Sequence, residues 1–254
     1  MVRGLELFRE HFRQHKNKYV IIGGTACDIY FESIGVDFRT TKDLDIVLII
    51  EALDIEFAKV FWAFVKKGNY MNIQKSTGKK LFYRFYDPRD KAFPYMLELF
   101  SRIPDFLQNF PENNLAPISF NNEASSLSVI LLENDYYEFL KKGVHILKDF
   151  PILLPEYLIP FKAKAYLDLL NSKNSGRKID NKDILKHRND IFRLYGTLSS
   201  NIKVELPSLI ADEMKTFLKI ISVESVNLTP LNVSGSTKEI IRNLKHIYGI
   251  DTGK

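Results

Sequence analysis

The chain has 254 residues, 45% hydrophobic and 26% charged, a balance that is ordinary for a soluble globular protein and excludes global disorder. Cys27 is the only cysteine, which excludes an internal disulfide and a cysteine-rich zinc site. No apolar run reaches the roughly 18 residues of a membrane span, and the N-terminal residues lack the apolar core of a secretory signal. We therefore expect a cytoplasmic protein with no membrane partner.

The first part of the chain alternates strand-like and helix-like segments. Residues 19–22 form a short apolar run that Gly23-Gly24 ends, which predicts a buried strand followed by a turn. The later strand-like segments cover residues 45–50, 80–86, 95–100 and 127–132. The helix-like segments, recognised by their apolar spacing and their stop signals, cover residues 25–32, 54–67 and 135–142.

After Pro155 the pattern becomes helical. Four segments have the apolar spacing or the boundary residues of helices, namely residues 156–170, 181–195, 207–223 and 237–248. We therefore predict an α/β (α+β) chain of two domains, an α/β domain over residues 1–150 and a helical domain over residues 151–254.

Asp43 and Asp45 stand at the start of an apolar strand, with Leu44 between them. Side chains alternate along a strand, so the two carboxylates point to the same face. They repel each other unless a cation lies between them. Mg²⁺ is commonly bound by one or two carboxylates together with the phosphates of a substrate. The alternative is a pair of solvated carboxylates in a turn, because an isolated Asp-x-Asp is common.

A glycine turn before the aspartate pair is a second candidate feature. Gly23-Gly24-Thr25 joins a strand to a helix, where glycine allows a ligand to approach the backbone and the helix N-terminus favours phosphate. Taken alone, the two glycines also fit an ordinary tight turn.

Glu98 stands among large apolar residues on an expected strand, and a buried carboxylate needs a partner. It is either paired, with Arg84 as the candidate, or it is a third metal ligand.

Taken together, these runs resemble a known family. Gly23-Gly24-Thr25-Ala26 and the run Arg39-Thr40-Thr41-Lys42-Asp43-Leu44-Asp45-Ile46 are similar to the signature of the DNA polymerase β-type nucleotidyltransferase superfamily. Within it, they resemble the AbiEii/AbiGii group of toxin nucleotidyltransferases. Residues 158–165 and 186–191 are similar to the Lys-bearing and Asp-bearing helices of that group. The resemblance covers about residues 19 to 195.

The resemblance implies a nucleotidyltransferase fold, in which a short mixed sheet flanked by helices precedes a helical domain. It also implies a role for each matching residue. Asp43 and Asp45 would bind two Mg²⁺ ions, with Glu98, matched by position only, as the third acid. The NTP-binding residues would be Gly23, Gly24, Thr25, Arg39 and Thr41. Lys162 would contact a phosphate, with Lys164 as its competitor, and Asp190 would orient the lysine or the base.

The function that the resemblance implies is transfer of a nucleoside monophosphate from an NTP to an acceptor hydroxyl, with release of pyrophosphate. The protein would then be a candidate toxin with a cognate antitoxin partner. Two alternatives stay open, a nucleotide-binding regulator without turnover and a small-molecule nucleotidyltransferase of the antibiotic-modifying kind. The stretch around Gly35-Val36-Asp37-Phe38 is longer than is usual in the group, which leaves the acceptor side of the site undefined.

The charge distribution bears on the acceptor. The formal net charge is +5, and residues 162–193 alone hold nine basic and four acidic residues, which equals the excess of the whole chain. A basic surface suits an RNA acceptor such as tRNA, because phosphate contacts dominate the affinity of such complexes. The alternative is the solvated face of two helices.

Overall fold

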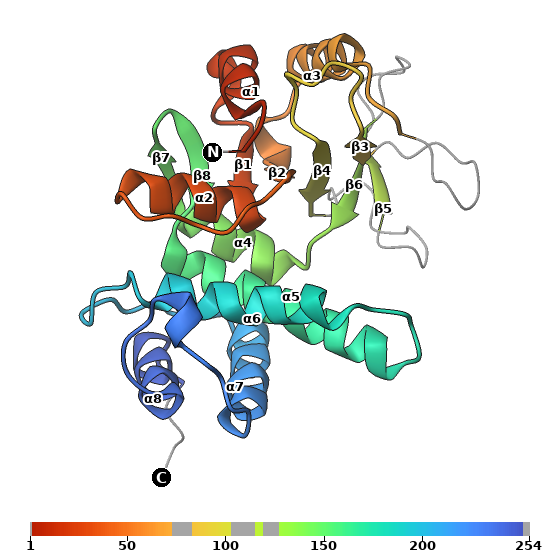
Figure 1. The fold of residues 1–254 in the computed structure, drawn as a ribbon. Coiled ribbons are helices and arrows are strands. Elements are labelled where there is room, and N and C mark those ends of the chain that lie inside the picture. Colours follow the sequence, from red (N-terminus) through yellow and green to blue (C-terminus); the bar gives the residue numbers. More distant parts are fainter. Residues whose placement is uncertain (1, 73–82, 103–114, 119–126, 251–254) are drawn as a thin grey trace. The chain divides into compact units, whose positions relative to one another are not determined.

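The computed structural model of the chain describes residues 2–72, 83–102, 115–118 and 127–250 (Figure 1). Its helices are α1 (Leu5–His11), α2 (Gly23–Ser33), α3 (Ile55–Gly68), α4 (Asn134–Lys142), α5 (Pro155–Asn174), α6 (Asn181–Tyr195), α7 (Ser208–Ser222) and α8 (Thr237–Ile247). Its strands are β1 (Tyr19–Ile22), β2 (Asp43–Leu48), β3 (Arg84–Tyr86), β4 (Met96–Ser101), β5 (Leu115–Ile118), β6 (Leu127–Leu131), β7 (Val144–Leu147) and β8 (Phe150–Leu153).

The chain forms two compact units. Unit 1 contains the described residues up to Tyr137 together with Val144–Leu153, and unit 2 contains Glu138–Gly143 and the described residues from Leu154 onward. The sequence placed a single boundary after residue 150. In the structure the chain passes from unit 1 to unit 2 within α4, returns for β7 and β8, and leaves again at Leu154.

The strands of unit 1 form one eight-stranded mixed sheet with the order β5-β6-β4-β2-β1-β8-β7, and β3 pairs with β4. The pairs β1–β2, β3–β4, β5–β6 and β7–β8 are antiparallel, whereas β2–β4, β4–β6 and β1–β8 are parallel. The expected α/β architecture, a mixed sheet with helices, is confirmed. No helix among the described residues is both long enough and apolar enough to cross a membrane.

The strand register gives the centre of this sheet two different faces. Residues that pair across neighbouring strands point to the same face. Ile21 pairs with Ile46, Ile46 with Leu99, and Leu97 with Phe85, so these apolar side chains share one face. The residues between them point to the opposite face, which we call the site face. The site face includes Asp43, Asp45, Arg84 and Glu98.

The apolar face is covered by aromatic side chains from α1 and α3. Phe12 of the segment after α1 contacts Tyr19 of β1 and Phe64 of α3, with ring centroids 6.0 and 5.4 Å apart. Phe61 of α3 packs edge-on against Phe85 of β3 at 5.6 Å. Each buried aromatic side chain contributes about 1.5–3 kcal/mol of burial free energy. This aromatic cluster packs on the apolar face of the central strands, so the polar side chains lie on the opposite, site face.

Asp54 fixes the start of α3. Its side chain accepts a hydrogen bond from the backbone N–H of Phe57, which is the N-cap contact expected of an aspartate. The Lys18 Nζ lies 2.6 Å from the other carboxylate oxygen. The hydrogen bond from Lys18 and that from Phe57 lower the pKa of Asp54, so the carboxylate stays ionised as cap and ion-pair partner.

Unit 2 is built on α5, against which α6 and α7 both pack. Pro160 stands inside α5 and has no N–H to donate to the carbonyl of Glu156. The hydroxyl of Tyr248, just after α8, donates to that carbonyl at 2.7 Å instead. Burial raises the pKa of Tyr248 well above its usual range. The end of the described chain thus compensates for the proline in α5.

Several expected elements match, and some differ. The helix α6 occupies the predicted residues, and α3, α4, α5, α7 and α8 lie within a few residues of their predicted bounds. The helix after the glycines was predicted over residues 25–32, but α2 begins at Gly23. The helix α1 and the strands β5, β7 and β8 were not predicted. Residues 80–82 of an expected strand lie outside the described residues.

Candidate functional site

The glycine turn forms the N-terminus of α2. Gly23 has a φ of +68°, a left-handed conformation that allows β1 to run directly into the helix. Ile22 occupies the N-cap position, where it makes no side-chain hydrogen bond to the helix, and the first turn contains no acidic residue. The first N–H groups of this 11-residue helix therefore receive no cap from the N-cap side chain and no acid from the first turn, and the negative group beside them is the Asp45 carboxylate of the neighbouring strand.

The turn and the aspartate strand fit against each other. A Cβ atom on Gly23 would overlap the carboxylate of Asp45, so only glycine leaves room for that side chain. Thr25 is fully buried, and its hydroxyl donates to the backbone carbonyl of Asp43 at 2.7 Å. The structure thus brings Gly23, Thr25 and the two aspartates together, and it holds both carboxylates half-buried on the site face.

Arg39 and Thr41 lie beside the second glycine. A Cβ atom on Gly24 would lie 2.5 Å from the Thr41 hydroxyl oxygen and 3.5 Å from Nη2 of Arg39. The Arg39 guanidinium stands over the ring of Phe38 at 5.2 Å, and that ring stacks on Phe31 at 5.1 Å. The two aromatic rings therefore support an arginine next to the turn. Phe38 is a positioning residue that the sequence alone did not single out.

Glu98 lies in register with Asp45 on the neighbouring strand β4, on the same face. Its carboxylate forms an ion pair with Arg84, whose Nε and Nη2 both donate to Oε1. Of the two roles that the sequence left open for Glu98, the pairing with Arg84 is present in the structure. Its role as a third metal ligand stays a prediction.

The carboxylates can be compared with what Mg²⁺ requires. Mg²⁺ is usually bound through one or two carboxylates and completed by substrate phosphates and water. Asp43 and Asp45 meet that requirement, because they share a face and remain partly exposed. Within the described residues, no group of three or more His, Cys, Asp or Glu side chains is arranged to hold a metal. The pair Asp43–Asp45 therefore fits the ion without Glu98.

The predicted basic and acidic residues of the helices are also placed. In unit 2, Lys162 is buried, and its Nζ donates to Oδ2 of Asp190 at 2.9 Å. Arg193 approaches the other oxygen of Asp190 at 3.8 Å. Lys164 is more exposed and forms ion pairs with Glu213 at 3.0 Å and with Asp168 at 3.4 Å. Asp190 thus holds Lys162, whereas Lys164 takes part in a surface network.

The remaining basic residues of the 162–193 segment divide into two groups. Lys186 and Arg188 form ion pairs with Asp183 and Glu224, at 3.1 and 2.6 Å. Four other cations are exposed and have no acid within ion-pair distance among the described residues. These four, which we call the hairpin tip, are Lys173, Arg177, Lys178 and Lys182.

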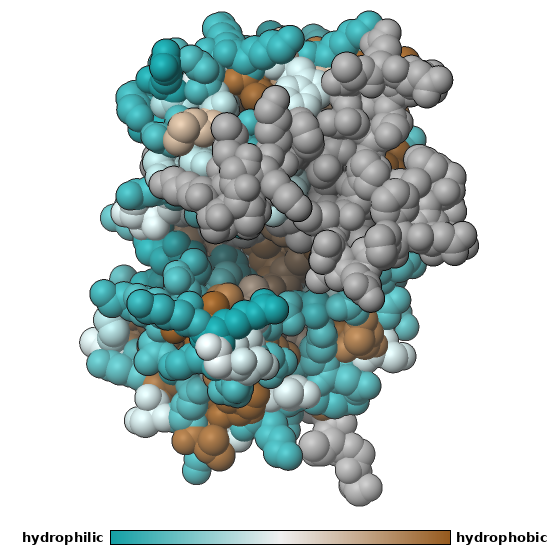
Figure 2. Space-filling model, turned by 90° about the vertical axis from the view of Figure 1, so that its right-hand side faces the viewer, coloured by the Kyte–Doolittle hydropathy of each residue, from teal (hydrophilic) through white to brown (hydrophobic). Residues whose placement is uncertain are grey.

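The hairpin tip lies where α5 is joined to α6, two helices that lie side by side in Figure 1. The loop that joins the two helices points to the right in Figure 1 and hence toward the viewer of Figure 2, where hydrophilic residues are interspersed with hydrophobic ones. The excess charge of the segment is therefore concentrated at one end of the helix pair. Local sequence does not indicate this concentration, because the partners Glu213 and Glu224 come from another part of the chain.

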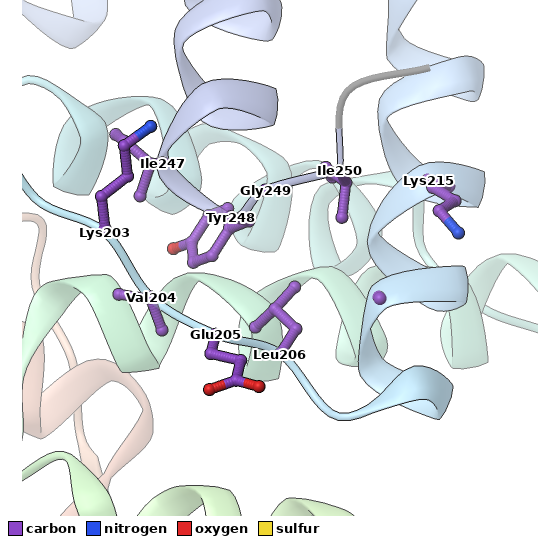
Figure 3. A pocket seen from close by; sticks show the side chains of 10 residues that line it. Lys203, Val204, Glu205, Leu206, Lys215, Ile247, Tyr248, Gly249 and Ile250 are labelled. Carbon is purple, nitrogen blue, oxygen red and sulfur yellow. The ribbon is translucent and has the colours of Figure 1, made fainter. Parts of the chain in front are cut away.

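Unit 2 also contains a cleft of about 440 Å³, shown in Figure 3. Side chains from the segment before α7, from one face of α7 and from the end of α8 surround it. Its lysines serve internal contacts, because Lys203 donates to the carbonyl of His246 at 2.7 Å and Lys215 to Asp212 at 2.9 Å. None of the residues that the sequence assigned to a site lines this cleft.

Comparison of the chain with protein-family models, with curated proteins and with solved structures finds no match. The functional assignment therefore depends on the residues and on their geometry in unit 1 and in unit 2.

Proposed function

We propose that the protein is a Mg²⁺-dependent nucleotidyltransferase with a polymerase β-type nucleotidyltransferase fold. The observation that carries the proposal is the fit of the Gly23–Thr25 turn against the Asp43–Asp45 strand, on the face of the sheet opposite its aromatic core. A ready anion site at a helix N-terminus beside two carboxylates is the arrangement that phosphoryl transfer requires, where positioning and charge neutralisation do most of the work.

Each part of the site would have a distinct task. The N–H groups at the start of α2 and the Arg39 guanidinium would bind the triphosphate, and Thr25 keeps the turn against the strand. Asp43 and Asp45 would hold Mg²⁺, which neutralises the phosphate charge when bound. The acceptor hydroxyl would form a new bond to the α-phosphorus and lose its proton to water, while the bond to the departing pyrophosphate breaks.

The same geometry supports an enzyme over a binding protein that only retains nucleotide. The two carboxylates lie next to the phosphate-binding turn and repel the triphosphate unless a cation is present. A module that binds nucleotide without turnover has no need of them. For the acceptor we favour RNA, because the hairpin tip presents exposed cations without acidic partners among the described residues.

The proposal can be tested by label transfer. Wild-type protein is incubated with each α-labelled NTP, Mg²⁺ and total RNA, and the labelled product is identified. The variants Asp43→Asn and Asp45→Asn keep side-chain size but remove the charge, and we expect either to abolish transfer and to weaken Mn²⁺ binding measured by electron paramagnetic resonance.

Asp37→Asn is a matched control, because Asp37 is an exposed acid of the loop between α2 and β2. It should leave both readouts unchanged. Circular dichroism should show the same fold for all variants. Undiminished transfer by Asp43→Asn and Asp45→Asn would contradict the metal-site assignment.

A further inference from the structure

One row of side chains crosses the site face from β3 to β1. Arg84 pairs with Glu98, Glu98 with Asp45, and Asp45 with Ile22, the residue before the glycine turn. Neighbouring strands lie about 4.8 Å apart, so the row runs about 14 Å from the phosphate-binding turn to Arg84. Asp45 lies between the two ends. Arg84 is therefore on the side of the carboxylates away from the turn.

Two acids stand next to each other in this row, beside one arginine. Asp45 and Glu98 are neighbouring acids, and like charges in paired positions are unfavourable. The Arg84 guanidinium offsets one of them, but both of its contacting nitrogens converge on a single oxygen of Glu98. Arginine carries five N–H donors in a fixed fork, so this contact leaves donor capacity for a second anion.

Exposure separates the two members of the pair. The side chain of Glu98 is 13% exposed, whereas that of Arg84 is 43% exposed. Glu98 is thus set into the sheet as an anchor, and the guanidinium extends into solvent. This division of roles is typical of an arginine held in place for recognition, because a pre-oriented guanidinium binds a phosphate in a defined geometry.

We propose that Arg84, positioned by Glu98, binds a phosphate of the acceptor. The inference rests on the nucleotidyltransferase function proposed above, and it assigns the acceptor to phosphate-bearing molecules, with RNA as the class that the unit 2 charges also favour. The nucleotide is held at the β1 end of the row, the acceptor at the β3 end, and the reacting phosphorus between them near Asp45. Glu98 is a positioning residue in this arrangement.

The test uses the full-length protein and two separate binding probes. Fluorescein-labelled bulk tRNA reports acceptor binding by anisotropy, and a fluorescent, non-hydrolysable ATP analogue with Mg²⁺ reports nucleotide binding. Arg84→Ala should weaken tRNA binding about tenfold or more, the effect of one charge-assisted hydrogen bond. It should also reduce the slope of log affinity against log salt by about one, while the analogue affinity stays within about twofold.

Glu98 is tested through Arg84. Glu98→Gln should weaken tRNA binding in the wild-type background but add nothing to Arg84→Ala, because Glu98 acts only by orienting the Arg84 guanidinium. Mn²⁺ affinity of the nucleotide-free protein should be unchanged by Glu98→Gln. Arg84→Lys keeps the charge without the fork and should restore part of the affinity. Arg102→Ala is the control, because it breaks another Arg–Glu pair of unit 1, at 3.2 Å from Glu51.

The possible failures point to different conclusions. Unchanged tRNA affinity and salt slope in Arg84→Ala would overturn the inference, as would a loss confined to the ATP analogue. A drop in Mn²⁺ affinity in Glu98→Gln would make Glu98 a metal ligand and overturn its positioning role. Wild-type protein that transfers label to a protein or small molecule and binds no tRNA overturns this inference only. Wild-type protein that binds no nucleotide overturns the proposed function as well.

Discussion

The closest fit in the candidate site is between Gly23 and the Asp45 carboxylate. Gly23 has a left-handed φ, and a methyl group there would collide with the side chain of the aspartate. Asp45 would have to move away from the face that it shares with Asp43. A substitution at Gly23 therefore tests the site without removing any charged or polar group.

Gly23→Ala should impair both stability and function. The left-handed backbone alone costs an L-residue about 1–2 kcal/mol, and displacement of Asp45 adds to this cost. We expect weaker Mn²⁺ binding and loss of label transfer, with a lower free energy of unfolding in urea. Gly35→Ala is the matched control, since Gly35 has a φ of +71° and a methyl group there would meet no atom within 4 Å. It should show the backbone cost only and retain Mn²⁺ binding.

At the residue scale the sequence singled out the candidate side chains and named Arg84 as a possible partner of Glu98, but it did not decide between ion pairing and metal binding. The shared face of Asp43 and Asp45 followed from strand geometry, and Glu98 was singled out by its apolar neighbours, whereas its role as a third acid came from the resemblance. Which residue opposes Glu98 depends on strand register, which is set by long-range packing and cannot be read from local sequence. The register in fact places Arg84 opposite it, one of the two options that the sequence left open.

At the scale of elements, the pair of helices α5 and α6 contains a buried ion pair. Lys162 and Asp190 are 4% and 0% exposed at their side chains, and their charged atoms lie 2.9 Å apart. Removal of one partner from a buried pair leaves a desolvated charge behind. We therefore expect the loss of one partner of this buried pair to lower the free energy of unfolding more than the loss of a surface ion pair does.

Lys162→Ala should lower the free energy of unfolding by about 3–5 kcal/mol. Lys164→Ala, two residues away, should cost only about 0–1 kcal/mol, because its ion pairs with Glu213 and Asp168 are partly solvated. Urea denaturation followed by circular dichroism measures both. Equal costs for the two variants would mean that the buried pair contributes no more than the surface network.

The hairpin tip makes a separate prediction about the acceptor. Arg177→Glu with Lys178→Glu should weaken tRNA binding strongly and flatten its salt dependence, because the reversed charges repel phosphates. Stability and nucleotide binding should be unaffected, since both residues are exposed. The matched control reverses Lys238 and Arg242, an exposed lysine and arginine of α8. Equal loss in both double variants would indicate a general charge effect instead of a binding surface.

The elements that the sequence did not predict have local reasons. The turn between β7 and β8 consists of Lys148 and Asp149, both with positive φ, at 49° and 69°. Such two-residue hairpins are usually marked by Asn-Gly or Asp-Gly, so Lys-Asp gives no signal. An ion pair from Lys16 to Asp149 at 2.6 Å, distant in sequence, supports the turn. The helix α1 has seven residues and a glycine N-cap without a side-chain cap, which makes it equally inconspicuous.

At the scale of the whole molecule, buried and half-buried tyrosines limit stability in alkali. Their pKa values are raised, chiefly by desolvation, in both units, and the tyrosines concerned are Tyr19, Tyr70, Tyr137, Tyr157, Tyr166 and Tyr248. A group with a raised pKa in the folded state binds its proton more tightly there than in the unfolded chain. Its contribution to the free energy of unfolding is complete below the pKa of the unfolded chain. It is lost as the pH rises through the pKa of the folded state.

Tyr166 gives this prediction a defined range. Its pKa is raised to about 12, first by burial and then by its hydrogen bond to Glu224. Wild-type protein should be more stable than Tyr166→Phe by about 1.5–3 kcal/mol at pH 8, the value of a hydrogen bond to a charged group. The difference should shrink from about pH 10 and vanish near pH 12, as urea unfolding at several pH values can measure. A difference that stays constant over this range would contradict the assignment.

Because the chain passes between the two units more than once, a fragment that contains one unit cannot be made by a single cut. A fragment that ends after residue 150 would lack most of β8, whose Ile152 pairs with Ile21 of β1. The strand β1 would then become an unprotected edge made of buried apolar residues, which promotes aggregation. A fragment that contains the whole sheet has to extend to Leu153. It also needs a hydrophilic spacer in place of residues 138–143. These residues belong to unit 2, and without that unit their apolar side chains would be exposed.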